Sequence, residues 1–144
     1  MISIFKNLSN STPIGDIEVE YTLVKLTSND TKYFDKIQQL REYEKGSSQY
    51  ESLKKQIPVV TWAGSFKKRS LSSLNQLSNH IYIDVDGDTS IKDVIIEEDF
   101  VKACWISCGG NGLGFLIESE GLTKKNFKST YKDIAEYFGE KGVI

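Results

Sequence analysis

The spacing of apolar and polar residues along this chain predicts its secondary structure. Residues 17–27 alternate between the two types, which predicts a half-buried strand. In the next segment, residues 28–46, Phe34, Ile37 and Leu40 recur at the spacing of one helix face, which predicts a helix. Together these elements predict an N-terminal α/β extension.

From residue 58 onward the predicted elements follow one another closely. Short β-branched runs predict strands, and apolar residues three or four positions apart predict helices. The expected elements are strands at 58–64, 80–86, 100–107 and 112–119 and helices at 70–79, 90–99 and 123–142.

The order of these elements from residue 80 is β-α-β-β-α. One further strand would complete the β-α-β-β-α-β unit of ferredoxin-like and RNA-recognition-motif-like folds. The closing residues 142–144 fit the start of such a strand. We therefore predict an α+β fold in a single domain, with an extension over residues 1–49 and a core over residues 50–144 whose last strand is cut off.

Length and composition are those of an ordinary globular domain. The chain has 144 residues, of which 39% are apolar and 26% charged. It contains no apolar run long enough for a membrane span and no N-terminal signal peptide, which predicts a cytoplasmic protein without membrane contact. Two cysteines and one histidine are too few for a disulfide framework or a recognisable four-ligand zinc site.

Charge is unevenly distributed, although the net charge is only −2. Residues 41–70 contain seven Lys or Arg and three acids, whereas residues 81–100 contain seven acids and one Lys. The net charge gives no support to nucleic-acid binding. A basic segment before an acidic one is compatible with anionic ligands held near a metal, and equally with two solvated surfaces.

Three carboxylates, Asp84, Asp86 and Asp88, stand at alternating positions where a predicted strand ends. A calcium loop of the EF-hand type would need Gly and a bidentate Glu at the positions of Thr89 and Ile95. It would also need a helix in place of the preceding strand. These three mismatches exclude that kind of site.

A phosphohydrolase of the haloacid-dehalogenase type also has a strand that ends in Asp-x-Asp-Gly-Thr. Here Asp88 stands between Gly87 and Thr89, and the acidic residues 97–99 lie at the end of a predicted helix, where they are poorly placed to complete a metal site. This alternative is therefore weak. A plain acidic turn without a ligand is the other alternative.

A nucleotidyl-transfer site would use the strand geometry directly. Residues i and i+2 of a strand share a face, so Asp84 and Asp86 project together and one Mg²⁺ or Mn²⁺ can bridge them. Two-metal phosphoryl transfer uses carboxylates in this way to hold a triphosphate and activate the attacking oxygen. Asp88, beyond the glycine, is predicted to be a turn residue that leads into the next helix.

The segment "WISCGGNGLGFLIES" joins the last two predicted strands through a glycine-rich turn. Glycines allow backbone N–H groups to approach an anion closely, as in phosphate-binding loops. The alternative is a β-hairpin with a flexible tip, and this turn alone does not distinguish the two.

The stretches "KKQIPVVTWAGSFKKRS", "LNQLSNHIYIDVDGD" and "FVKACWISCGGNGLGFLIE" together resemble the N-terminal domain of virulence-associated protein E-type proteins of phages and mobile elements. That domain belongs to the archaeo-eukaryotic primase (primase-polymerase) superfamily. The resemblance covers residues 50–144. The family's metal-binding Asp-x-Asp matches Asp84 and Asp86. Its Ser-x-x-Gly-x-Gly turn matches Ser107, Gly110 and Gly112. Its Gly-x-Phe with a following Arg matches Gly64, Phe66 and Arg69.

This resemblance implies nucleotide addition on a DNA template with Mg²⁺ or Mn²⁺, in the cytoplasm of a bacterial or phage-infected cell, often beside a helicase. Asp84 and Asp86 are the implied catalytic metal ligands. The implied contacts to the nucleoside triphosphate and nucleic acid are Ser107, Gly109, Gly110, Asn111 and Gly112 in the turn and Lys67, Lys68 and Arg69 upstream.

Two departures from the family pattern favour a second expectation. Gly114 stands where the superfamily has a His, or this branch a Lys, that contacts phosphate. A further carboxylate would be expected on a strand beyond residue 144. The alternative expectation is therefore a catalytically degenerate nucleotide- or DNA-binding module of the same fold.

Overall fold

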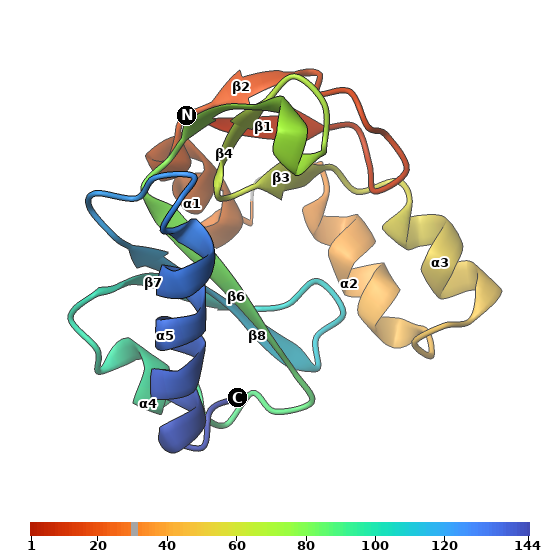
Figure 1. The fold of residues 1–144 in the computed structure, drawn as a ribbon. Helices are drawn as coiled ribbons and strands as arrows, with labels where there is room; N and C mark the ends of the chain where they lie inside the picture. The colour runs from red at the N-terminus through yellow and green to blue at the C-terminus, as the bar shows by residue number, and fades with distance from the viewer. Residues whose placement is uncertain (30–31) are drawn as a thin grey trace. The chain divides into compact units, whose positions relative to one another are not determined.

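The structure is a computed structural model that describes residues 1–29 and 32–144. The chain forms two compact units, Met1–Ser78 and Asn79–Ile144. The fold is mixed α+β, as predicted, and neighbouring strands in each sheet of the described residues pair antiparallel (Figure 1). Among the described helices, none combines the length and apolar character of a membrane-crossing segment.

The N-terminal unit is built around β1 (Ile2–Phe5), the central strand of a sheet ordered β2-β1-β3. Its neighbours are β2 (Gly15–Ile17) and β3 (Val59–Thr61). Ile2 and Phe5 are fully buried, so this short strand supplies much of the unit's core. The sequence pattern predicted no strand here, because four residues are too few to show a period.

The predicted strand at residues 17–27 is wrong, since α1 (Val19–Thr27) is a helix. Val19 and Thr22 are its buried residues, three positions apart, and the Thr22 hydroxyl donates a hydrogen bond to the Glu18 carbonyl at 3.0 Å. Tyr21 and Val24 are more than half exposed. Apolar residues therefore occupy both faces of the helix, and this produced the misleading alternation.

The predicted helix at residues 28–46 is confirmed in a shorter form as α2 (Phe34–Glu42), which buries Leu40. Residues 30 and 31 of that prediction lie outside the described part of the chain. A further helix, α3 (Ser48–Lys54), packs beside α2. The Ser47 hydroxyl caps it by accepting a hydrogen bond from the Tyr50 N–H at 3.2 Å.

The predicted helix at residues 70–79 is also wrong. This segment forms a 3₁₀ turn (η1, Leu71–Ser73) and then β5 (Leu74–Leu77), which pairs with β4 (Gly64–Phe66). Leu71 is 88% exposed, whereas Leu74 and Leu77 are half-buried. The leucines thus share a helical spacing without sharing a buried face, and pairing with β4 decides the conformation.

The C-terminal unit contains all five elements predicted from residue 80 onward, in the predicted order. They are β6 (His80–Asp86), α4 (Lys92–Ile96), β7 (Val101–Ile106), β8 (Gly112–Glu118) and α5 (Phe127–Glu140). The sheet order is β6-β8-β7. Since β6 and β7 are each antiparallel to β8, they are parallel to one another, and α4 lies in the crossover between them.

One face of this sheet forms the core of the unit. Ile81, Ile83 and Val85 of β6 and Leu113, Phe115 and Ile117 of β8 are all buried. Helix α5 packs on this face, where the rings of Phe115 and Phe138 meet edge to face at 4.9 Å between centroids (Figure 1). On α5, Phe138 is fully buried, whereas Tyr131 is 41% exposed.

A polar contact holds the end of α5 to the segment after α4. Glu98 accepts hydrogen bonds from the Tyr137 hydroxyl at 2.7 Å and from the Lys141 ammonium group, with which it also forms an ion pair. The hydrogen bonds from Lys141 and then Tyr137 lower the pKa of Glu98, and Glu98 and then Tyr137 raise the pKa of Lys141 to about 12.

This contact predicts a stability difference that depends on pH. A carboxyl group whose pKa is lowered in the folded state stabilises the fold at pH values above the ordinary pKa of Glu. This stabilisation is lost as pH falls through the lowered pKa. Glu98→Gln should therefore reduce the free energy of urea unfolding at neutral pH. The difference from wild type should begin to shrink as pH falls to the ordinary Glu pKa, about 4.3, and should vanish only below the lowered pKa of Glu98. The control is Glu136→Gln, which removes an exposed ion pair to Lys132 and should have little effect at either pH. A Glu98→Gln effect of equal size at acidic and neutral pH would contradict this origin.

Candidate functional site

The second face of the β6-β8-β7 sheet carries the acidic pair. Along β6, Ile81, Ile83 and Val85 are at most 8% exposed, whereas Asp84 and Asp86 are exposed. The strand predicted at residues 80–86 is confirmed, and its alternation directs both carboxylates away from the core. Two oxygen-bearing side chains on one exposed face are suited to a hard divalent cation.

The register of the sheet sets a glycine directly beside each acid. Asp84 pairs with Gly114, and Asp86 pairs with Gly112 on the central strand β8. A Cβ atom on Gly112 would lie 2.4 Å from the Val85 carbonyl oxygen, so no other residue fits without a shift of the backbone. Gly112 therefore has a structural role in the packing of β8 against β6, in addition to any contact with a ligand.

The glycine-rich turn lies at the same end of the sheet as Asp86. It joins β7 to β8 in a hairpin, in which the Ser107 N–H donates to the Gly112 carbonyl at 2.8 Å and the Gly110 N–H donates to the Ser107 carbonyl at 2.9 Å. The Gly87 N–H, next to Asp86, donates to the Asn111 carbonyl at 2.8 Å. The turn and the acidic strand end are thus joined directly, with the Gly110 amide engaged inside the turn.

Asp88 is held by the loop that leads into α4. Its carboxylate accepts hydrogen bonds from the Ser90 N–H at 2.8 Å and the Ser90 hydroxyl at 2.7 Å, and these bonds lower the pKa of Asp88. This geometry agrees with its interpretation as a turn residue. Helix α4 itself begins after Ile91 without a side-chain cap.

Within the described residues, no three His, Cys, Asp or Glu side chains are grouped as a metal site would require. The candidate metal site therefore consists of two carboxylates, Asp84 and Asp86. Oxygen ligands of this kind fit Mg²⁺, which typically takes one or two carboxylates together with substrate phosphates and water.

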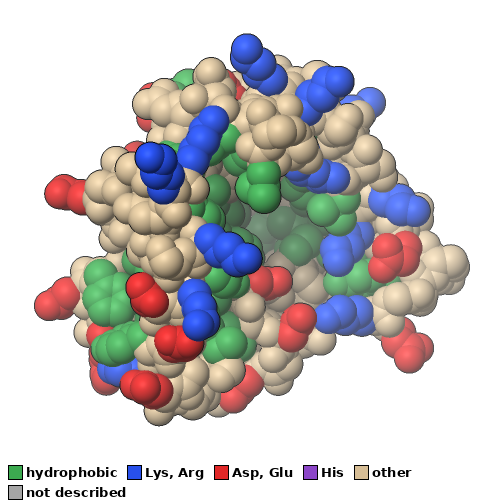
Figure 2. All heavy atoms as spheres, viewed as in Figure 1, with side chains coloured by type: hydrophobic (Ala, Val, Ile, Leu, Met, Phe, Trp, Pro, Cys, Tyr) green, Lys and Arg blue, Asp and Glu red, His purple; other side chains and the backbone are tan. Residues whose placement is uncertain are grey.

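The basic residues predicted to contact phosphate belong to the N-terminal unit, in the segment between β4 and β5. Lys67 and Lys68 are exposed. The Arg69 guanidinium group donates to the Leu8 carbonyl and lies 5.6 Å from the centre of the Phe5 ring. Arg69 therefore fastens the loop after β1. Figure 2 shows basic side chains projecting at its top, where Figure 1 shows β1, β2 and β4.

Two aromatic side chains complete the acidic face, and sequence reasoning missed both. The Tyr82 hydroxyl donates a hydrogen bond to Asp84 Oδ1 at 3.2 Å, and the Tyr82 ring stacks with that of Trp105. Burial of the ring, followed by the charge and hydrogen bond of Asp84, raises the pKa of Tyr82, so its hydroxyl stays protonated and remains a donor. Strand alternation alone would have indicated that Tyr82 shares the face of Asp84.

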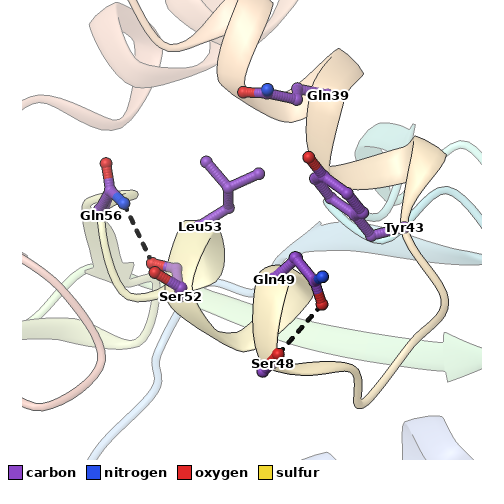
Figure 3. A pocket seen from close by; sticks show the side chains of 7 residues that line it. All are labelled: Gln39, Tyr43, Ser48, Gln49, Ser52, Leu53 and Gln56. Carbon is purple, nitrogen blue, oxygen red and sulfur yellow. Dashed lines mark hydrogen bonds between the residues drawn. The ribbon is translucent and has the colours of Figure 1, made fainter.

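A separate open pocket of about 360 Å³ lies between α2 and α3 in the N-terminal unit (Figure 3). Its lining side chains are uncharged, and two of its hydrogen bonds are internal, from Ser48 to Gln49 and from Gln56 to the Ser52 carbonyl. None of the predicted site residues lines it. The lining residues are Gln39, Tyr43, Ser48, Gln49, Ser52, Leu53 and Gln56.

Comparison with protein families matches residues 52–140 to the family described as BT4734-like, N-terminal domain. That match includes the acidic strand, the glycine-rich turn and the basic segment. Comparisons with curated proteins and with solved structures gave no match. Because the matched region is more than half of the chain, the protein belongs to the BT4734-like N-terminal domain family.

Proposed function

We propose that this chain is a metal-dependent nucleotidyl-transfer domain of the primase-polymerase type, which adds nucleotides on a DNA template. The observation that carries the proposal is the shared exposed face of Asp84 and Asp86, with the glycine-rich turn joined to the same end of the sheet. In phosphoryl transfer, carboxylate-held cations orient the triphosphate and stabilise the charge that develops on it.

Each part of the site has a role in this proposal. Asp84 and Asp86 would hold Mg²⁺ or Mn²⁺, which supplies charge neutralisation for the triphosphate. Tyr82 fixes one oxygen of Asp84 by its hydrogen bond and leaves the other oxygen for the cation. The turn at residues 107–112 would lie beside the phosphates, because it is bonded to the backbone next to Asp86.

The strand arrangement supports the RNA-recognition-motif-like or ferredoxin-like topology that we propose for residues 79–144. Two parallel strands, β6 and β7, flank β8 and are linked by a crossover that contains α4, as in a split β-α-β unit. Within the described residues β6 pairs only with β8.

The proposed partners follow from the charges. Nucleoside triphosphates would bind at the acidic face through the metal. The exposed Lys67 and Lys68 are suited to phosphates of a DNA template, since lysine contacts phosphate as a mobile point charge. A helicase domain or protein is a further proposed partner, on the family resemblance alone.

A catalytically degenerate nucleotide- or DNA-binding module is the second candidate. Two observations favour it: the pair has no third carboxylate among the described residues, and Gly114 offers no cation to a phosphate. This candidate keeps metal and nucleotide binding but lacks nucleotide addition.

Metal binding tests what the two candidates share. Asp84→Asn and Asp86→Asn should each weaken Mn²⁺ binding, measured by isothermal titration calorimetry, by at least about 10- to 100-fold, the loss caused by removing even an outer-shell partner. Asp88→Asn is the matched control, because this nearby acid is held by Ser90, and its Mn²⁺ affinity should equal that of wild type. Equal affinities in all four proteins would contradict the metal site. Binding that depends on the pair but supports no nucleotide addition would favour the second candidate.

A further inference from the structure

The acidic face of the C-terminal sheet also carries an aromatic pair, Tyr82 on β6 and Trp105 on β7. Their rings are nearly parallel, at 19° between planes and 5.8 Å between centroids. Both residues are half-buried. Trp105 lies two strands away from Asp84, so metal binding by the acids does not explain its presence on this face.

Gly114 is what allows the two rings to meet. It lies on β8 between Asp84 and Trp105, with which it is directly paired on either side. A Cβ atom there would come within 2.7 Å of the Tyr82 hydroxyl oxygen and 3.0 Å of Trp105 Nε1. The edges of both rings therefore lie over a position without a side chain, and the stacked pair stands beside the acids.

The hydrogen bond from Tyr82 to Asp84 joins this aromatic pair to the candidate metal site. A ligand that used both would need a planar ring at one end and metal-binding oxygens at the other. Asp84 and Trp105 are two strand spacings apart, about 10 Å, which a nucleoside triphosphate can bridge with its base at one end and its phosphates at the other.

We propose that Tyr82 and Trp105 form the subsite on which the base of the bound nucleotide stacks, while its phosphates reach the cation held by Asp84 and Asp86. This inference rests on the proposed function. It also gives Gly114 a role: the position that lacks a phosphate-binding cation makes room for the stacking pair. Stacking on an aromatic side chain tolerates any base, as a template-directed enzyme requires.

Fluorescence of Trp105 provides the test. The chain has two tryptophans, and Trp62 is buried in the N-terminal unit, so Trp62→Phe leaves Trp105 as the single reporter. With Mg²⁺ present, dATP should quench Trp105 emission, whereas inorganic tripolyphosphate should bind with little quenching. In the Trp62→Phe, Asp84→Asn protein, both ligands should lose their affinity.

Substitution of the ring supplies the second measurement, by calorimetry. Trp105→Leu should weaken dATP binding by about 5- to 150-fold, the value of one stacked base, and leave tripolyphosphate binding unchanged. Trp105→Phe keeps an aromatic ring and should retain most of the dATP affinity. If Trp105→Leu does not fold, the affinity of Trp105→Phe for dATP and for tripolyphosphate is the measurement that remains.

The outcomes separate the two proposals. Tripolyphosphate binding that does not depend on Mg²⁺ and Asp84 would overturn the proposed function. If that dependence holds but dATP binds no more tightly than tripolyphosphate, or Trp105→Leu weakens both equally, the stacking subsite is overturned. Stronger quenching by a single-stranded oligodeoxythymidylate without Mg²⁺ would assign the pair to a nucleic-acid strand and overturn its assignment to the metal-bound nucleotide.

Discussion

Asp84→Asn and Asp86→Asn should each reduce Mn²⁺-dependent primer extension by at least about 100- to 1,000-fold, the range typical of losing one preorganised electrostatic contact to a transition state. The physical reason is that Asp84 and Asp86 are the two exposed carboxylates on one face of β6 that would hold the cation. The measurement is incorporation of labelled nucleotides on a primed DNA template.

Asp88→Asn is the control for this experiment, since it removes an equal charge close to the site. Its carboxylate is occupied by Ser90, so its loss should leave nucleotide incorporation near the wild-type rate. Circular dichroism should show that all three proteins are folded, because the substituted side chains are exposed. Equal incorporation by Asp84→Asn, Asp86→Asn and wild type would contradict the catalytic assignment.

Gly112→Ala should destabilise the protein by about 2–4 kcal/mol, in the upper range for a single substitution. The added Cβ would lie 2.4 Å from the Val85 carbonyl oxygen, and this oxygen belongs to the backbone of the neighbouring strand, so it cannot rotate away. Strands β6 and β8 would have to separate next to Asp86. The measurement is the free energy of unfolding in urea, together with Mn²⁺ affinity, which should also fall.

Gly139→Ala is the matched control in the same unit. Gly139 lies in α5, and the nearest atom to an added Cβ is 3.8 Å away, an ordinary contact. Alanine is the better helix former, but Gly139 is the second-last residue of α5, so this change should alter the free energy of unfolding by no more than about 0.5 kcal/mol. A Gly112→Ala protein as stable as wild type would contradict the close approach of β8 to β6.

Local pattern predicted the C-terminal unit well because its strands are strongly periodic. The β6 strand has three β-branched residues on one face and polar ones on the other, and its predicted bounds, residues 80–86, are those observed. The same reasoning failed at residues 17–27 and 70–79, where apolar residues are compatible with more than one period. There, packing and strand pairing override local preference.

The acidic pair was predictable from spacing, whereas its surroundings were not. That Asp84 and Asp86 share a face follows from the geometry of any strand. That Trp105 stacks with Tyr82 over Gly114 depends on the register of three strands, and no single segment contains this information. Gly114 illustrates the difference. In the sequence it is only a position where the resembled family has a phosphate-binding cation, whereas the structure shows that it makes room for the two rings.

The sequence by itself determined the order of the elements from residue 80, the shared face of the two carboxylates and the turn role of Asp88, because each depends on residues close together in the chain. Only the tertiary structure decided the helical state of α1, the strand state of β5, the glycine beside each acid and the aromatic pair. These depend on which distant segments pair and in which register. Hydrogen bonding between strands and the burial of their apolar faces select that pairing for the chain as a whole.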